Sequence, residues 1–180
     1  MAKSVEALTP AAMREVELVK LGLEFEDGLM NDPEYREALR QGNWARAAEC
    51  VHAVVGPTVP RSAKTIDEPT WEWYFVGDGA TRDMVGQCAF KAPPTDEGVV
   101  EIAYFTYPRF EGRGYATSMA RRLIGLASTS LAIRRVIAHT LPHLSASTRV
   151  VEKVGMTFVG EVMDPEDGRV WRWEIERDLR

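Results

Sequence analysis

The 180-residue sequence has few of the residues that would link a fold covalently or bind a metal. Its two cysteines, Cys50 and Cys88, lie far apart, and none of its three histidines forms a Cys/His cluster with them. This pattern excludes a zinc-finger motif and a disulfide scaffold. We therefore predict two buried, reduced thiols, no bound metal and a cytoplasmic location.

Long apolar runs are also missing. No window approaches the roughly 18 consecutive apolar residues that a membrane span requires. Residues 1–10 lack the cationic region and following apolar stretch of a secretion signal. The net charge of −5 argues against a nucleic-acid-binding protein. We predict neither a membrane nor a nucleic acid as a partner.

The length suits one domain over residues 1–180, which would bury roughly 70% of its unfolded surface without covalent support. The charge within it is uneven. The segment from Arg109 to Lys153 contains eight basic and two acidic residues, so it carries +6 and the rest carries −11. We expect the basic segment to meet an anion, while the acidic remainder favours a cationic ligand.

Local patterns predict an α+β arrangement. Helical periodicity, caps and terminating glycines predict helices over about 9–21, 33–40, 44–55, 116–127 and 145–154. Apolar and β-branched runs predict strands over 4–8, 71–76, 84–91, 99–107, 135–140, 157–163 and 170–175. The helix between 99–107 and 135–140 makes those two strands parallel, and we expect antiparallel neighbours elsewhere. Trp44 is predicted to lie in the core, and the alternative is that it contacts a substrate.

Residues 108–117, with the sequence PRFEGRGYAT, connect a β run to an amphipathic helix. Gly112 and Gly114 allow a tight turn that exposes backbone amides, and the helix N-terminus adds a partial positive charge. The segment therefore predicts a phosphate site. Two glycines at this spacing also occur in ordinary strand-to-helix turns.

The order Arg109, Gly112, Gly114 after such a strand resembles the acetyl-CoA signature of the GNAT superfamily of N-acyltransferases. The segments VEIAY, GRGYAT and STRVVEKVG are similar to the branch that includes ribosomal-protein N-terminal acetyltransferases, over residues 70–175. The resemblance implies the GNAT fold. That fold has a mixed, mostly antiparallel sheet of six to seven strands, about four helices, and a parallel pair that splays apart between the fourth and fifth strands.

The same resemblance implies acetyl-CoA as the acyl donor. Its pantetheine arm would enter the gap between the splayed strands, and its pyrophosphate would meet the amides of the turn. The residues implied in cofactor binding are Tyr104, Thr106, Arg109, Gly112, Arg113, Gly114, Tyr115, Ala116 and Thr117.

Two residues are candidates for the chemistry. Glu101, a carboxylate within an otherwise apolar strand, is our candidate general base for the acceptor amine; the alternative is a solvent-facing side chain. Ser147 matches a serine that the resembled branch places in the helix after the fifth strand, where it would protonate or hydrogen-bond the leaving thiolate. The alternative is that Ser145 or Ser147 caps this helix. His139 could act as a base, although a histidine in a β run is more typical of a satisfied core residue.

The sequence departs from the family pattern at Val151 in place of a tyrosine, Leu144 in place of an asparagine, and Glu111, whose carboxylate would repel a pyrophosphate. These departures keep a second hypothesis open, a non-catalytic acyl-CoA-binding module or sensor. A nucleotide-binding enzyme fits less well, because no GK[ST] follows the glycines. The acceptor, a small-molecule amine or a protein N-terminus, is not readable from the sequence, and a homodimer is left open.

Overall fold

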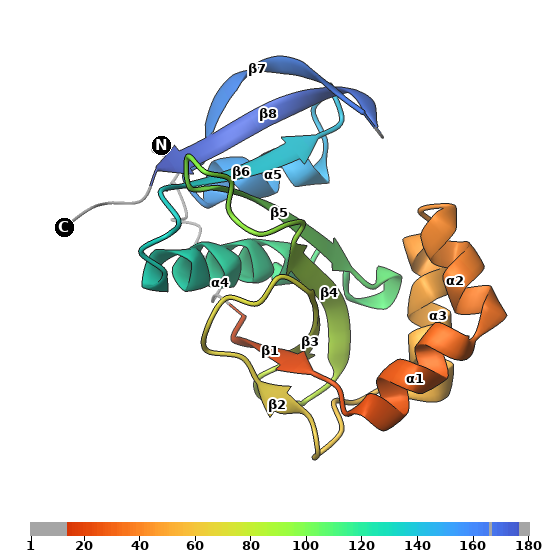
Figure 1. Cartoon of the computed structure of the whole chain (residues 1–180). Helices are drawn as coiled ribbons and strands as arrows, with labels where there is room; N and C mark the ends of the chain where they lie inside the picture. Colours follow the sequence, from red (N-terminus) through yellow and green to blue (C-terminus); the bar gives the residue numbers. More distant parts are fainter. Residues whose placement is uncertain (1–13, 166, 177–180) are drawn as a thin grey trace, which may run out of the picture.

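The computed structural model describes residues 14–165 and 167–176, which form one mixed sheet with helices on both sides (Figure 1). The strands are β1 (Val16–Lys20), β2 (Lys64–Thr65), β3 (Trp73–Asp78), β4 (Met84–Phe90), β5 (Val99–Thr106), β6 (Arg135–Thr140), β7 (Thr157–Asp164) and β8 (Gly168–Glu176). The helices are α1 (Leu23–Asn31), α2 (Pro33–Arg40), α3 (Trp44–Val54), α4 (Tyr115–Thr129) and α5 (Ala146–Lys153), and a 3-10 turn covers Pro108–Phe110.

The strands follow the order β2-β1-β3-β4-β5-β6-β8-β7, and every neighbouring pair is antiparallel except β5 and β6. The predicted mixed sheet with one parallel pair is therefore confirmed. The described residues form eight strands and five α-helices, one or two strands and one helix more than the resemblance implied. Two strands near the N-terminus were not predicted, so the parallel pair consists of the fifth and sixth strands, not the fourth and fifth.

The N-terminal prediction was wrong where the structure describes it. Residues 16–20, predicted as the end of a helix, form β1, which pairs with β2 and β3. Pairing on both edges and burial of Leu18 and Val19 outweigh the helical pattern. Helix α1 was missed because the residue at its N-cap position is Gly22, which has no side chain to cap the helix and gives no capping signal in the sequence. The predicted strand at 4–8 and the helix start at Thr9 lie outside the described residues.

The next two helices begin where their capping residues predict. The Asp32 carboxylate accepts hydrogen bonds from the amides of Glu34 and Tyr35 at the start of α2. The Asn43 side chain accepts one from the amide of Arg46 at the start of α3. The later helices and the C-terminal hairpin also lie within a few residues of their predicted bounds.

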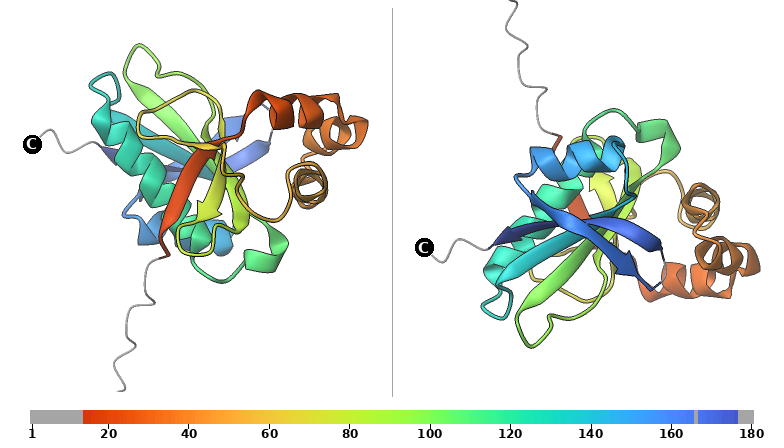
Figure 2. Two further views of the ribbon diagram at one scale, coloured as in Figure 1. Left: turned by 90° about the horizontal axis from the view of Figure 1, so that it is seen from below. Right: turned by 90° about the horizontal axis from the view of Figure 1, so that it is seen from above.

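The helices lie on opposite sides of the sheet. Helices α1, α2 and α3 gather on one side, and α4 lies on the other, as the further views in Figure 2 also show. Met119 and Leu123 of α4 are fully buried in the core with Val100 and Ile102 of β5. Strand β5 therefore has the core on one face and the α1–α3 side on the other. No helix in the described part of the chain is long and apolar enough to span a bilayer.

Candidate active site

The sheet opens between its two parallel strands. Strands β5 and β6 pair at three positions, from Val99 opposite Arg135 to Glu101 opposite Ile137. Within the described residues no pairing continues beyond Glu101, although β5 runs on to Thr106. The expected splayed pair is present.

The backbone direction of β5 decides which groups face this gap. The carbonyl of Glu101 accepts from the amide of Lys91, and the amide of Tyr107 donates to the carbonyl of Val85, so the odd-numbered residues point toward β4. Backbone groups alternate along a strand, so those of Tyr104 and Thr106 point into the gap. The Thr106 hydroxyl is also buried and has no hydrogen-bond partner among the described residues.

The turn before α4 has the backbone that the glycines predict. Gly112 has φ 71° and Gly114 has φ 90°, in the region that non-glycine residues rarely adopt. A Cβ at either position would meet no described atom within 4 Å, so glycine is needed for backbone conformation and not for space. No described side chain caps α4, so the first-turn amides remain available to an anion.

A cleft of about 570 Å³, here called the glycine-turn cleft, joins this turn to the strand gap. Its walls come from the end of β5, the turn, the start of α4 and one face of α5. They are Tyr104, Phe105, Thr106, Phe110, Glu111, Gly112, Gly114, Tyr115, Ala116, Thr117, Ala146, Ser147, Arg149, Val150 and Lys153. Arg149 and Lys153 were not among the predicted site residues. The four-residue spacing that puts them on one helix face was the signal that could have found them.

The two arginines of the motif lie differently. The guanidinium carbons of Arg109 and Arg113 stand 4.6 and 5.8 Å from the ring centroid of Phe110, and neither side chain lines the cleft. The basic lining comes from α5 instead. Glu111 does line the cleft, so an acidic residue stands in the wall where an anion would bind.

The Tyr115 hydroxyl does not face the glycine-turn cleft as a ligand group, because it is engaged elsewhere in the fold. That hydroxyl donates a buried hydrogen bond of 2.7 Å to Asp78 at the end of β3. Burial opposes ionisation of Asp78, but the Tyr115 hydroxyl and the amides of Ala80 and Thr81 outweigh it and lower the pKa of the carboxyl. Burial and the Asp78 carboxylate raise the pKa of Tyr115. This contact fixes the first residue of α4 against the β3–β4 hairpin.

A second cleft, of about 820 Å³, lies on the α1–α3 side of β5 and is called here the Glu101 cleft. Its walls come from β5, β6, the end of α2, the start of α3 and the β7–β8 turn. They are Leu39, Arg40, Gln41, Gly42, Trp44, Trp73, Lys91, Glu101, Ile102, Ala103, Tyr104, Phe105, His139, Ser147 and Asp167. Tyr104, Phe105 and Ser147 line both clefts, so the two meet at the strand gap.

The Glu101 side chain is 20% exposed in the wall of its cleft. Its Oε1 lies 3.1 Å from Lys91 Nζ and 3.1 Å from His139 Nδ1. Burial disfavours the Lys91 ammonium, but Glu101, Asp164 and Asp167 outweigh it and raise the pKa of Lys91. His139 is not a fully satisfied core histidine, because its Nε2 is buried without a partner among the described residues.

The helix that carries Ser147 is capped by its neighbour. The Ser145 side chain accepts from the amide of Thr148, and the Thr148 hydroxyl accepts from the amide of Ser145. Ser147 is thus left exposed on the first turn, where it lines both clefts. Val151, in the place of the family's tyrosine, is fully buried, and Leu144 is 80% exposed.

The described residues contain no group of three or more metal-ligating side chains. Cys50 and Cys88 are buried free thiols, as predicted, and burial raises the pKa of both. Neither cysteine lines either cleft.

A sheet that opens at its parallel pair, beside a glycine turn and an uncapped helix, is the arrangement expected of an acyl-transfer protein. The sequence comparison gives the same class. Residues 13–157 match the family model described as "Acetyltransferase (GNAT) domain", so the chain belongs to this family. A curated relative, the "Uncharacterized N-acetyltransferase p20" of Bacillus licheniformis, is 26% identical over 89 residues, 49% of this chain. The aligned segment covers 50% of the length of that relative.

Solved structures share the fold at low identity. A RimL ribosomal L7/L12 alpha-N-protein acetyltransferase in complex with coenzyme A is 16% identical, covers 95% of this chain and 98% of its own, and has a TM-score of 0.62. An aminoglycoside acetyltransferase AAC(6')-Ib in complex with coenzyme A is 21% identical, covers 91% and 95%, and has a TM-score of 0.58. A Vibrio cholerae spermidine N-acetyltransferase in complex with CoA and spermine is 16% identical over 58% and 64%, with a TM-score of 0.51.

Proposed function

We propose that this chain transfers an acetyl group from acetyl-CoA to a primary amine by direct attack, without a covalent enzyme intermediate. The observation that carries the proposal is the strand gap. Tyr104 and Thr106 direct backbone groups into it, and it joins the glycine-turn cleft to the Glu101 cleft. A donor and an acceptor can therefore approach each other from opposite sides of the sheet.

The donor side suits an extended, anionic cosubstrate. The gap-facing groups of β5 can pair with the amides of a pantetheine arm, and the open amides of α4 suit a pyrophosphate. Arg149 and Lys153 supply positive charge on the opposite wall. Arg109 and Arg113, stacked on Phe110, would act on the phosphates from outside the cleft.

The acceptor side supplies the proton transfers. Acetyl-CoA provides a thioester whose carbonyl carbon forms the new C–N bond as its C–S bond breaks. Glu101 takes the proton from the attacking nitrogen, directly or through water, because a protonated amine has no lone pair to attack. Ser147, which lines both clefts, donates a proton or a hydrogen bond to the departing thiolate. The products are an acetamide and the free thiol.

His139 and Lys91 hold the carboxylate of Glu101 in place. Both contact the same oxygen, Oε1, which leaves Oε2 for the amine. His139 does so in the tautomer that carries its hydrogen on Nδ1, which then donates to Oε1.

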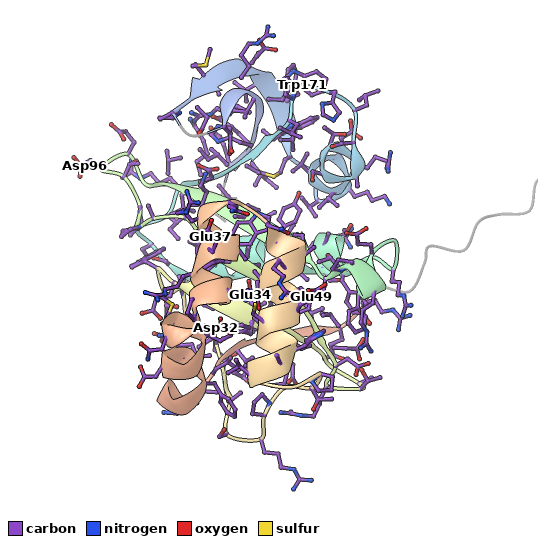
Figure 3. The ribbon with its side chains drawn as sticks, turned by 90° about the vertical axis from the view of Figure 1, so that its right-hand side faces the viewer. Asp32, Glu34, Glu37, Glu49, Asp96 and Trp171 are labelled. Carbon is purple, nitrogen blue, oxygen red and sulfur yellow. The ribbon has the colours of Figure 1, made fainter. Side chains whose placement is uncertain are left out.

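The surface charge does not identify the acceptor. Figure 3 shows Glu34, Glu37 and Glu49 on α2 and α3, and each is paired there, with Arg46, Arg40 and Arg46 respectively. The acidic excess is thus partly neutralised outside the clefts. A cytoplasmic location, a place in the branch of ribosomal-protein acetyltransferases and a homodimer stay predictions.

A non-catalytic acyl-CoA-binding module is the alternative. The buried Val151 favours it, because no hydroxyl stands where the family often has a tyrosine. Release of free thiol in the presence of an amine separates the two, since a sensor would bind acetyl-CoA without turnover.

Calorimetric titration with acetyl-CoA, with ATP as the control ligand, tests the donor site. Micromolar affinity, about −8 kcal/mol, is expected for acetyl-CoA and not for ATP. Acetyl-CoA at 100 times the dissociation constant should raise the free energy of unfolding by about 2.7 kcal/mol. If acetyl-CoA does not bind, or binds no better than ATP, the proposal fails.

A further inference from the structure

A third pocket adjoins the Glu101 cleft beneath α1–α3. This tryptophan pocket has a volume of about 370 Å³, and its apolar walls are Leu29, Met30, Tyr35, Trp44, Trp73 and Phe75. It shares Leu39, Trp44 and Trp73 with the Glu101 cleft, so the two are continuous along these residues. A ligand that reaches Glu101 can therefore extend into this pocket.

The sheet places the pocket at a defined reach from Glu101. Strand register aligns Trp73 with Ala89 and Ala103 across β3, β4 and β5. Ala103 lies two residues beyond Glu101, so both side chains point to the same face. Trp73 lies two strands away from Glu101 across the sheet and two residues away along it. At the usual strand spacing and rise, their backbones are about 12 Å apart. Ala103 lines the Glu101 cleft between these two side chains, and Ala89 is buried.

Aromatic rings form the wall along this path. Trp44 packs against Trp73 with ring centroids 5.2 Å apart, and against Phe105 at 6.0 Å. Trp73 is nevertheless 41% exposed, and Trp44, predicted as core, is only partly buried. Exposed aromatic surface inside a cleft is hydrated at a cost in free energy, so an apolar ligand that covers it gains binding free energy.

The charges next to this wall favour a ligand without a carboxylate, although Glu72 is itself paired with Lys20. The charged groups in the lining of the tryptophan pocket are the carboxylates Glu26 and Glu72, and no Lys or Arg of the described residues lines it. In the Glu101 cleft the cations Arg40 and Lys91 are engaged by Glu37 and Glu101. An acceptor with its own carboxylate would find no free partner in these linings.

We propose that the acceptor is a small apolar primary amine whose hydrophobic body, an aromatic ring or branched alkyl group, packs on Trp44 and Trp73 while its amino group lies beside Glu101. The inference rests on the proposed function for the chemical step, in which the nitrogen gains the acetyl group and loses its proton to Glu101. It adds the acceptor class, which the family does not specify.

Probe amines on the wild-type chain test the class. The panel contains 2-phenylethylamine, ethylamine without the ring, phenylalanine with an added carboxylate, spermidine, and a peptide that begins with phenylalanine. With saturating acetyl-CoA, kcat/KM for 2-phenylethylamine should exceed that for each of the others by about 10- to 100-fold. A preference for ethylamine, spermidine, phenylalanine or the peptide overturns the proposal.

Two tryptophan variants form a matched pair. Trp73→Ala should abolish the preference for 2-phenylethylamine over ethylamine, reducing the ratio to within about threefold. Trp71→Ala is the control, because Trp71 is 38% exposed, packs on Phe90 and lines neither cleft. It should leave the ratio unchanged. An unchanged ratio in Trp73→Ala overturns the proposal.

Binding without chemistry separates this inference from the proposed function. Quenching of tryptophan fluorescence by 2-phenylethylamine, with coenzyme A present, should be saturable in the wild-type chain and in Trp71→Ala but not in Trp73→Ala. Saturable binding with no turnover of any amine supports the acceptor pocket and refutes the enzyme. Turnover of other amines without saturable binding of 2-phenylethylamine supports the enzyme and refutes the pocket.

Discussion

The two clefts that meet at Ser147 are built from different parts of the polypeptide. The glycine-turn cleft offers backbone groups, from a strand that has lost its neighbour and from a helix end without a cap, beside the basic residues Arg149 and Lys153 of α5. The Glu101 cleft and its tryptophan extension offer side chains from β3, β5, β6, α2 and α3. Two glycines are enough to maintain the backbone conformation of the glycine turn, whereas the shape and polarity of a side-chain surface change with each substitution. This difference suits a constant donor and a variable acceptor.

Replacing Glu101 should have the largest effect. We expect Glu101→Gln to lower kcat by about 100-fold or more at neutral pH, because an amide cannot accept the amine proton. The affinity for acetyl-CoA should not change, since the donor side does not use this carboxylate. Thiol release and calorimetry measure the two quantities. Unchanged turnover between about pH 6 and 9 would rule Glu101 out as the base.

Glu174→Gln is the matched control for that variant. Glu174 is 17% exposed and pairs with Arg172 and Arg135 on β8 and β6, but lines neither cleft. Its kcat should remain within about threefold of the wild-type value. A loss as large as that of Glu101→Gln would show that charge on this sheet, and not the base, controls the rate.

The backbone character of the donor side is tested by two glycines. Gly114→Ala should lower the free energy of unfolding by about 1–2 kcal/mol, because alanine resists φ 90°, and should weaken acetyl-CoA binding. Gly125→Ala, in the exposed interior of α4, should raise it by about 0.5–1 kcal/mol. Urea unfolding compares them. Equal effects at both sites would contradict a special turn conformation.

The contact that fixes α4 to the β3–β4 hairpin should be sensitive to pH. We expect Tyr115→Phe to lower the free energy of unfolding by about 1–2 kcal/mol near pH 7. The lowered pKa of Asp78 makes its contribution disappear as the pH falls below about 4, and the raised pKa of Tyr115 removes it above about pH 10. The difference from wild type should form a plateau between these limits. A difference that does not change with pH would exclude a hydrogen bond from the neutral Tyr115 hydroxyl to the Asp78 carboxylate.

The smallest effect is expected from the one acidic side chain of the glycine-turn cleft. Glu111→Gln should tighten acetyl-CoA binding about two- to fivefold, because it removes a carboxylate from an anion site that is open to water. The gain should shrink at high salt. Calorimetry at two salt concentrations measures it, and weaker binding would mean that Glu111 contacts the ligand favourably.

The donor side was readable from the sequence because its determinants are contiguous. Gly112 and Gly114 mark the turn, and the β5 pattern with its crossover helix predicts the parallel pair. Arg109 and Arg113 fit the motif, but the structure stacks them on Phe110, a contact that spacing does not reveal. The roles given to Glu101 and Ser147 stay predictions.

The acceptor side could not be read in the same way. Trp44, Trp73 and His139 come together only through sheet register and the packing of α3, which single-sequence periodicity does not contain. The early strand β1 was missed for a related reason. Its five residues are specified by pairing with β3, a contact about 60 residues away in sequence.

The short junction between β5 and β6 also bears on how the molecule unfolds. Three residue pairs connect five strands on one side with three on the other, so sheet hydrogen bonding couples the two groups weakly. Packing of α4 and α5 must supply the remaining cooperativity. A ligand that hydrogen-bonds across the junction would couple the two groups of strands more strongly. The rate at which the amide protons of β6, β7 and β8 exchange with solvent would then fall as the ligand binds.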